Sequence, residues 1–466
     1  MKRSFIIVFV FFVWSLFFIH SCSVNDKIGE DSFSTKDEVG MVRSSTVSFK
    51  DVETFICERK NIIDTKDLQA YRIEPILVEK DTVMYLVNYD DGWEVISGDM
   101  RTEPILFFCD HGNISKEELF ANPASESVFE GLSLYLDSLR VNPVKMNNEQ
   151  PTKGNPVPPS SFFDENGRYW ALAYKYLARS SEDLQNPLSG LRWGQGTLTG
   201  PPYMNWNATM PYRSPLHGNR CVAGCGPVAV AQTLVYLHQK NSSPSEFYSN
   251  ATCTGFLPDT TSILVLNAYN TSFSGYGDYW SSLPVKAIGT SASKFKIASS
   301  LLLHIGLLSN SEYGYNNTTS SLSNLQFALQ SYGYNSTLSS SYSNIFRTQI
   351  FQNKMPVILR ISGQRVEGST VSELKHFVVA EGYKKRNEVY TFVYKNGDTG
   401  TFEYRYKQYT FSYEYLAINW GYDGSGEYNS TNDVIWCNVN SSLHRDFSGG
   451  YDNGTITHML YNFVER

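Results

Sequence analysis

The sequence predicts an α+β protein in which a helical half precedes a β half, behind a smaller α+β domain. Hydrophobic residues make up 41% of the 466 residues, which is enough for two or more domains with large cores. Helical periodicity dominates from residue 225 to 331, whereas apolar runs typical of strands dominate from 356 to 420. A proline-rich stretch at 151–159 separates this large part from the residues before it.

The N-terminus has the pattern of an export signal. Lys2 and Arg3 precede an apolar run from Phe5 to Ile19 that is short for a membrane span. Cys22 follows this run after a small residue, as in bacterial lipoprotein signals. We expect residues 1–22 to carry the signal, with Cys22 acylated and bound to a lipid membrane. The protein would then be exported to the cell envelope or secreted; an ordinary signal peptide cut nearby is the alternative.

A small α+β domain is expected over 46–140, after a polar tether at 23–45. Apolar spacing predicts a short helix that ends near Arg59. An Asp91-Gly92 turn between apolar runs predicts a hairpin. The expected strands are 82–89, 93–97 and 104–108, and a helix is expected over 128–140.

The segment 141–184 is predicted to link the two domains and to contain an activating cut. Its proline-rich stretch is stiff and exposed, which favours proteolytic nicking. We expect a helix over Trp170 to Arg179.

The large domain is expected over 185–466, with helices first and strands afterwards. Such an arrangement, with a cleft between the two halves, is an α+β architecture. The expected helices are 225–239, 292–307 and 321–331, and the expected strands are 356–361, 376–380, 388–394 and 416–420.

Composition argues against several classes of protein. The formal net charge of −7 disfavours nucleic acid as a main partner. The cysteines are spread out, and the chain contains neither CxxC nor HExxH, so we expect no metal and no organic cofactor. A Cys221–Cys225 disulfide could form, but it would block the thiol of Cys225. Sequons such as Asn207 and Asn316 are interpreted as polar loop sequence.

Cys225 is the strongest candidate for a catalytic residue. It stands between Gly224 and Gly226 at the start of an apolar helix. The helix dipole and the unpaired N–H groups at such a position favour the thiolate, which is the nucleophilic form. The two glycines would let a substrate backbone approach the sulfur. A buried, inert cysteine is the alternative.

A thiolate nucleophile needs a base, and the base needs an orienting group. His376 begins an apolar strand after Cys225, and Asn419 follows later, which is the papain-like order of Cys, His and Asn. The side-chain carbonyl of Asn419 would accept a hydrogen bond from the imidazole, and Trp420 would shield that bond from water. His217 and His458 are the rival bases.

Gln195 completes the predicted site. It lies in a glycine-containing loop upstream of Cys225. Its side-chain amide and the backbone N–H of Cys225 would together form an oxyanion hole.

These motifs resemble the streptopain family of papain-like cysteine peptidases, including its Bacteroidetes members. Residues 193–195 with 202–205 are similar to the start of the mature enzymes, and residues 223–232 are similar to the nucleophile helix. Residues 418–421 are similar to the Asn-Trp-Gly motif, and residues 85–106 resemble the inhibitory pro-domain. The resemblance implies a papain-like peptidase of two subdomains behind an α+β pro-domain.

The chain departs from the family pattern at a few positions. Lys375 stands where the family often has glycine before the base, and Met204 interrupts the Pro-Tyr-Asn run. A few residues are inserted between Gln195 and Pro202, and the loop after Gly421 differs. These changes bear on cleft shape and specificity more than on the chemistry.

The resemblance implies a cysteine endopeptidase made as a zymogen, which hydrolyses protein or peptide substrates through a thioester. Its own pro-domain would be its intramolecular inhibitor. Two other hypotheses stay open. A peptidoglycan-peptide hydrolase would share the Cys-then-His order, but it usually lacks a folded pro-domain and the Asn-Trp-Gly signal. A catalytically silent surface binding or inhibitor lipoprotein would keep the fold alone.

Overall fold

The computed structural model describes a large share of the chain in separate ranges. These are residues 46–60, 71–99, 102–121, 123–141, 161–195, 206–211, 220–241, 255–256, 263–264, 283–285, 290–314, 317–341, 344–367, 370–397, 403–421, 435–439 and 455–465. The chain divides into two units, Met1–Ser44 and Ser45–Arg466, and all described residues belong to the second. The expected signal, Cys22 and the tether therefore lie outside the described residues. Within the described ranges, no helix is both long and apolar enough to span a membrane.

Residues 46–141, called here the N-terminal region, form the predicted α+β unit of helices on an antiparallel meander. The predicted hairpin at Gly92 is confirmed: this residue has a φ of +98°, and a Cβ there would lie 2.7 Å from the carbonyl oxygen of Cys109. The elements are α1 (Phe49–Lys60), β1 (Arg72–Val78), β2 (Asp81–Asn88), β3 (Trp93–Ser97), β4 (Ile105–Cys109), α2 (Lys116–Ala121) and α3 (Pro123–Val141).

The prediction of a helix over Trp170 to Arg179 is wrong, because this segment belongs to a strand. After β5 (Ser161–Phe163), β6 (Tyr169–Gln185) pairs antiparallel with a long strand of the large part, from Trp170↔Asn396 to Gln185↔Tyr383. Aromatic residues have high β propensity, and the edge of the neighbouring strand supplies backbone hydrogen-bond partners along one side of the segment.

The large part contains the predicted helices followed by strands, which confirms the α+β class. The helices agree closely with prediction, but β11 and β12 run for 27 and 16 residues, much longer than expected. The elements are α4 (Cys225–Asn241), β7 (Gly255–Phe256), β8 (Ile263–Leu264), α5 (Ala292–Leu308), α6 (Leu322–Ser331), β9 (Tyr334–Ser339), a π-helix (Arg347–Gln352), β10 (Val357–Glu367), β11 (Thr370–Asn396), β12 (Tyr404–Asn419), β13 (Ile435–Asn438) and β14 (Thr455–Glu465).

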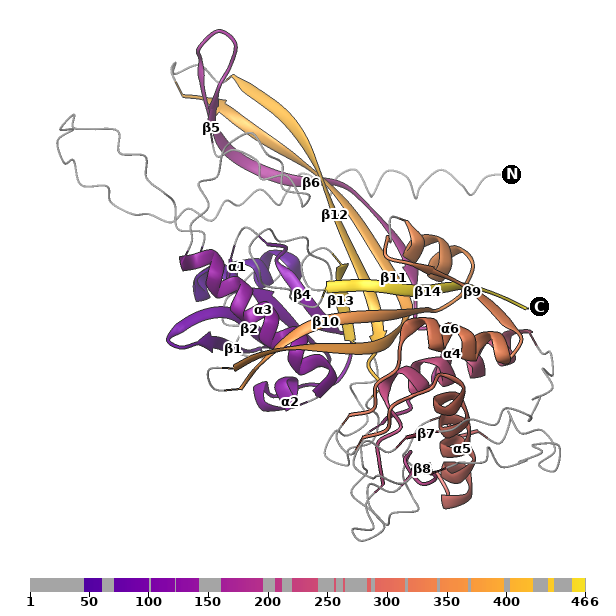
Figure 1. Ribbon diagram of the computed structural model, residues 1–466. Helices are drawn as coiled ribbons and strands as arrows, with labels where there is room; N and C mark the ends of the chain where they lie inside the picture. The colour runs from indigo at the N-terminus through magenta and orange to yellow at the C-terminus, as the bar shows by residue number, and fades with distance from the viewer. Residues whose placement is uncertain are drawn as a thin grey trace, which may run out of the picture. The chain divides into compact units, whose positions relative to one another are not determined.

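One large sheet joins the N-terminal region to the large part (Figure 1). Its strand order is β1-β2-β3-β4-β13-β12-β11-β10-β14-β9, with β6 added along the second half of β11. The junction is β13, which pairs with β12 on one side and with β4 on the other. There Phe108 stacks on Trp436 with ring centroids 5.7 Å apart, and the buried Asn438 side chain donates to Glu103 at 2.5 Å.

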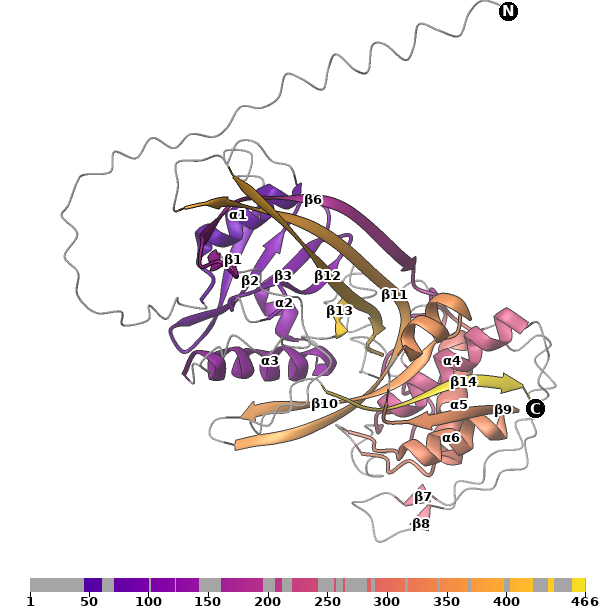
Figure 2. The ribbon, with the colours of Figure 1, turned by 90° about the horizontal axis from the view of Figure 1, so that it is seen from above.

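The part of the sheet around β11 has an apolar core on each face. Phe377 and Val379 pack into the core formed by α4, α5 and α6, whereas Val378 and Ala380 pack into a core that includes α3. This follows from the two-residue period of a strand. Figure 2 shows α3 beside β10, while α4–α6 gather around β9 and β14. The N-terminal region therefore covers the sheet face opposite the helical half.

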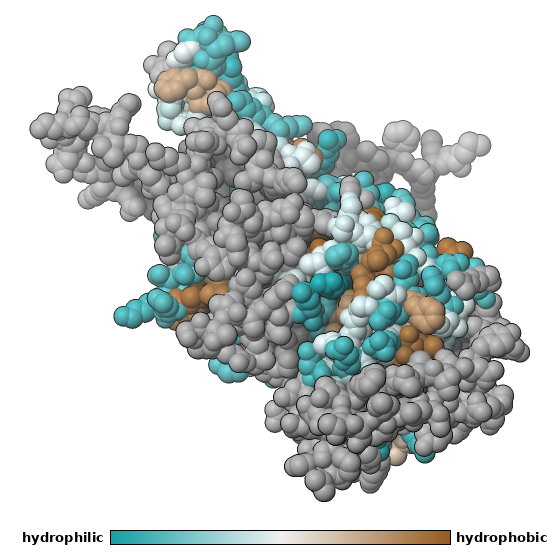
Figure 3. Space-filling view, viewed as in Figure 1, coloured by the Kyte–Doolittle hydropathy of each residue, from teal (hydrophilic) through white to brown (hydrophobic). Residues whose placement is uncertain are grey.

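β5, β6 and the outer halves of β11 and β12 form a strand arm with its own aromatic cluster around Trp170, Phe392 and Tyr394. The ammonium group of Lys407 lies 3.3 Å from the ring centroid of Phe162. Phe163 near the end of the arm is 70% exposed, and Figure 3 shows an apolar area there.

Candidate active site

Cys225 is the first residue of α4, as predicted. Gly224 before it has a φ of +91°, and a Cβ there would lie 2.9 Å from the side chain of Thr318. A Cβ on Gly226 would lie 3.0 Å from Leu325. The protein's own atoms thus fill the space beside both glycines. This differs from the predicted reason for them, which was close approach of a substrate.

The side chain of Cys225 is buried and hydrogen-bonds to the ring of His376. Burial alone would raise the pKa of this thiol. The charge of His376, the hydrogen bond with its ring, and the N–H groups of Phe377 and Gly226 outweigh burial and lower the pKa below its usual value. The helix N-terminus and the strand that carries His376 thus both stabilise the thiolate.

The pKa of His376 moves in the opposite direction. Burial alone would lower it, but the charge and hydrogen bond of Cys225 and the carbonyl of Trp420 raise it above its usual value. Both shifts favour a thiolate–imidazolium ion pair, in which the nucleophile and the proton donor are ready together.

The imidazole is oriented by a main-chain group. Nε2 of His376 lies 2.9 Å from the carbonyl oxygen of Trp420. Because a carbonyl only accepts hydrogen bonds, Nε2 carries a proton, and the other ring nitrogen is left for the sulfur of Cys225. Trp420 itself is buried.

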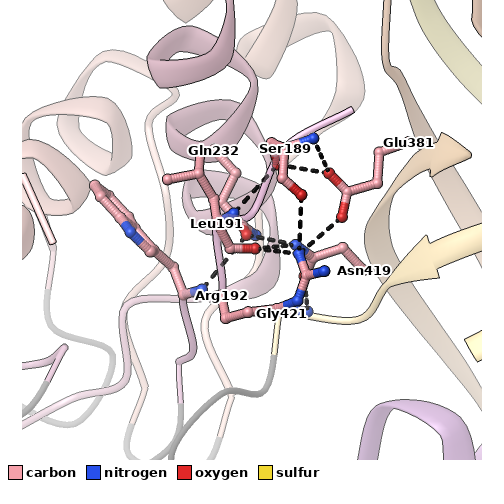
Figure 4. Close-up of polar contacts among 8 residues, drawn as sticks. Ser189, Leu191, Arg192, Gln232, Glu381, Asn419 and Gly421 are labelled. Atoms are coloured by element: carbon pink, nitrogen blue, oxygen red, sulfur yellow. Dashed lines mark hydrogen bonds and ion pairs between the residues drawn. The ribbon is translucent and has the colours of Figure 1, made fainter. Parts of the chain in front are cut away.

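Asn419 does not have the contact predicted for it. Its Nδ2 donates to the carbonyl of Leu191 at 2.8 Å and to Oε1 of Gln232 at 2.6 Å (Figure 4). Its Oδ1 accepts from the backbone N–H of Gly421 at 3.2 Å. The predicted hydrogen bond from His376 is thus replaced by the one to the Trp420 carbonyl. Asn419 instead ties the end of β12 to α4 and to the chain around residue 191.

Gln195 is buried and held through its backbone. Its N–H donates to the carbonyl of Gly421 at 3.2 Å, and its carbonyl accepts from Nδ2 of Asn207 at 3.0 Å. Oδ1 of Asn207 accepts from the N–H of Ala223 at 2.8 Å, two residues before Cys225. Asn207 therefore connects the chain carrying Gln195 to the chain carrying Cys225. The role of the Gln195 side chain as oxyanion donor stays a prediction.

Sequence reasoning missed Asn207, Gln232 and Glu381. Asn207 was interpreted as a loop sequon, but it is 1% exposed. The signal available for it was the neighbouring Trp206, a large apolar residue beside the sequon. Gln232 lies inside the helix that Cys225 begins, where a polar residue among apolar ones indicates a buried partner. Glu381 lies within an apolar stretch of β11 and gives the same signal.

The rival residues are accounted for where the structure describes them. His458 lies on β14, opposite Arg360 of β10, and His217 lies outside the described residues. Cys221 and Cys225 are both free thiols, so the disulfide considered from the sequence is not formed. Burial raises the pKa of Cys437 well above its usual value.

A thiol and an imidazole that share a hydrogen bond at a helix N-terminus form the nucleophile–base pair of cysteine peptidases. Residues 200–428 match the model of the peptidase C10 family. The chain belongs to this family, the streptopain family, as its motifs predict. The matched range contains Cys225, His376, Asn419 and Trp420, and it begins just after Gln195.

Two solved structures from Prevotella intermedia are similar to this chain. A mutant fragment of prointerpain A is 16% identical, with 84% of this chain and 98% of that chain covered and a TM-score of 0.49. The active wild-type interpain A cysteine protease is 16% identical, with 61% of this chain and 94% of that chain covered and a TM-score of 0.36. No curated protein matches the sequence.

Proposed function

We propose that the protein is an endopeptidase that cuts protein substrates with the thiolate of Cys225. The observation that carries this proposal is the hydrogen bond between Cys225, at the start of α4, and the ring of His376, with pKa shifts of both groups that favour the charged forms. The membership of the peptidase C10 family supports it.

The proposed reaction begins when Sγ of Cys225 attacks the carbonyl carbon of the scissile bond. The negative charge moves to the carbonyl oxygen, which the N–H of Cys225 and the amide of Gln195 stabilise. The imidazolium of His376 gives its proton to the leaving amine as the C–N bond breaks, and a thioester remains. His376 then takes a proton from water, whose oxygen attacks the thioester. The acid leaves and the thiolate is restored.

The same proposal includes latency and export. The N-terminal region packs on the sheet that carries His376 and Asn419, which supports its role as an intramolecular inhibitor. The activating cut would lie in the predicted segment 141–184. Export and a lipid on Cys22 rest on the sequence pattern at the N-terminus.

The test compares purified 23–466 with its Cys225→Ala variant under reducing conditions. The wild type should shorten to a fragment of the large domain and cleave casein, whereas the variant should do neither. If the wild type cleaves casein only after an activating protease is added, the proposed peptidase activity stands but self-processing does not. Purified cell wall tested in parallel detects a peptidoglycan hydrolase. A processed wild type that is inert and whose Cys225 resists an epoxysuccinyl inhibitor would overturn the proposal.

A further inference from the structure

A buried ion pair lies beside Asn419, because Arg192 and Asn419 both donate to the carbonyl of Leu191. Nη1 of Arg192 is 2.9 Å from Oε1 of Glu381, and the two side chains are only 11% and 2% exposed. Moving two charges out of water costs several kcal/mol per ion unless their hydrogen bonds are satisfied. A contribution to stability therefore does not by itself explain why this ion pair is buried here.

Glu381 holds the chain at Leu188 and Ser189 as well as the side chain of Arg192. Its Oε2 accepts from the hydroxyl of Ser189 at 2.5 Å and from the N–H of Ser189 at 3.2 Å (Figure 4). Its backbone carbonyl accepts from the N–H of Leu188 at 2.9 Å. Arg192 also donates to the carbonyl of Leu191 at 2.6 Å. Glu381 alone thus makes four contacts with residues 188–192.

The local backbone places Glu381 for this contact. It is the extra residue of a β-bulge, because Ala380 pairs with Ile418 and Gly382 pairs with Ala417. A bulge changes the direction of a side chain and is common beside active sites. Glu381 also stands where β10 stops pairing with β11 and β6 begins.

Residues 188–195, called here the bridging segment, connect the two halves of the large part. On the helical side, the N–H of Trp193 donates to Oε1 of Gln232 at 3.4 Å and its indole N–H donates to the carbonyl of Pro284 at 2.7 Å. On the β side, the segment contacts Glu381 and Asn419 and ends at the Gln195 contact with the loop after β12. Gln195 is the last residue of this segment.

We propose that the Arg192–Glu381 pair is a positioning device for the oxyanion hole. It fixes the bridging segment on β11, and thereby fixes Gln195 relative to Cys225. Arg192 and Glu381 are positioning residues, since they act through the segment and touch no reacting atom. This inference rests on the proposed peptidase function.

The chemistry of the pair suits this role better than an apolar contact would. The guanidinium is planar and its donors have fixed directions, so the contact defines an orientation as well as a distance. A misplacement of about 1 Å in a catalytic group can cost about a hundredfold in rate. The expected signature is therefore a loss in the chemical step with the thiolate left intact.

The test uses Glu381→Gln in the full processed enzyme, beside wild type and the control Glu388→Gln. Glu388 makes an ion pair with Arg386 at 2.6 Å further along β11, so the control makes the same chemical change away from the site. For Glu381→Gln we expect kcat on a peptide substrate to fall about 10- to 100-fold with little change in KM. The rate of Cys225 alkylation by iodoacetamide, and its pH profile, should not change, because the groups that stabilise the thiolate are untouched.

A second variant separates positioning from stability. Arg192→Met combined with Glu381→Met replaces the buried charges by apolar side chains, a change that often keeps or raises stability. The proposal expects this folded double variant to keep the low kcat. Recovery of wild-type kcat with recovered Tm, or parallel loss of kcat and alkylation rate in Glu381→Gln, would overturn it. An inactive wild type would instead overturn the proposed function.

Discussion

At the scale of residues, Cys225 depends on groups from two elements for its ionisation. The N–H of Gly226 belongs to α4, while His376 and the N–H of Phe377 belong to β11. The thiolate is therefore available only when the helical half and the β half are correctly apposed. This coupling explains why so many buried polar contacts lie at the boundary between the two halves.

Removing the imidazole should change the ionisation of the thiol. In His376→Ala we expect the pH profile of Cys225 alkylation to move to higher pH, because burial then raises the pKa without the opposing charge. Peptidase activity should fall by a factor on the order of 10³ or more. The control is His458→Ala on β14, which should leave both the profile and the activity unchanged. An unshifted profile in His376→Ala would contradict the ion pair.

The pH dependence of wild-type activity has a predictable sign. Activity requires the thiolate and the imidazolium together, so it should rise on the acid side as Cys225 ionises, below the usual pKa of a thiol. It should fall on the alkaline side as His376 loses its proton, above the usual pKa of an imidazole. A profile of kcat/KM against pH measures both limbs. An alkaline limb at or below the ordinary imidazole pKa would contradict the raised pKa of His376.

Asn207 should matter for folding as well as for catalysis. In Asn207→Ala the carbonyl of Gln195 and the N–H of Ala223 lose their partner in a buried place. A buried polar group without a partner costs about 1–3 kcal/mol, so the free energy of unfolding should fall by about that amount. Chemical denaturation measures it, and Asn166→Ala in an exposed turn is the control. Equal stability of the two variants would show that Asn207 is not the link inferred from its contacts.

The pairing of Cys225 with His376 could be predicted from the sequence, because a cysteine at a helix start and a histidine near the start of an apolar run are local patterns. The hydrogen-bond partners of Asn419 could not be predicted from the sequence. The direction of its side chain depends on which side of β12 faces His376, and no local pattern encodes this. Glu381 was missed for a related reason, since its direction depends on a bulge set by the partner strand.

At the scale of elements, β6 shows how strand pairing overrides a helical interpretation. In a short apolar stretch, helical and strand patterns are hard to separate by periodicity. Trp170 and Leu172 alternate with alanine, a two-residue period that fits the strand. The edge of β11 supplied the partner, and no sequence pattern indicates that β11 runs for 27 residues.

Proline substitutions can test the pairing of β6. Lys175 pairs with Phe392, so Lys175→Pro removes a donor within the ladder and should open the strand arm to limited proteolysis. Ala178 lies at a register shift between Arg179 and Leu177, where proline is better tolerated, so Ala178→Pro is the matched control. Hydrogen exchange over 383–396 should rise in the first variant only. Equal exchange in the two variants would contradict the register.

At the scale of the whole molecule, the N-terminal region and the large part share one core. The face of the sheet opposite α4–α6 packs with α3 and the strands β2–β4. The apolar side chains on that face include Val357, Leu359, Ile361, Val378 and Ala380. Uncovering them would expose contiguous apolar surface, which folded proteins avoid.

A cut in the predicted segment 141–184 should therefore not release the N-terminal region. We expect the two pieces of a nicked Cys225→Ala chain to elute together in size-exclusion chromatography without denaturant. Phe108→Asp, which places a charge against Trp436 at the β4–β13 junction, should weaken their association. Separation of the nicked pieces in native buffer would contradict the shared core. If the pieces stay together, activation needs removal of the region after the cut.

The order of the elements, with helices before strands in the large part, could be predicted from composition and spacing. The single sheet that joins the N-terminal region to the large part could not be predicted, since β4 and β13 lie far apart in the sequence. Glu103 and Asn438, which bond across this junction, are 335 positions apart. Local patterns identify strands but do not say which strand each one neighbours.

The position of β13 between β4 and β12 limits how this protein can be recombined with its relatives. β13 has only four residues, and both of its edges are occupied, one by each part of the chain. A chimera that exchanged residues 46–141 alone would give β13 a foreign neighbour on one edge. Grafting should succeed only when 435–439 is exchanged as well, so the N-terminal region is not a portable module.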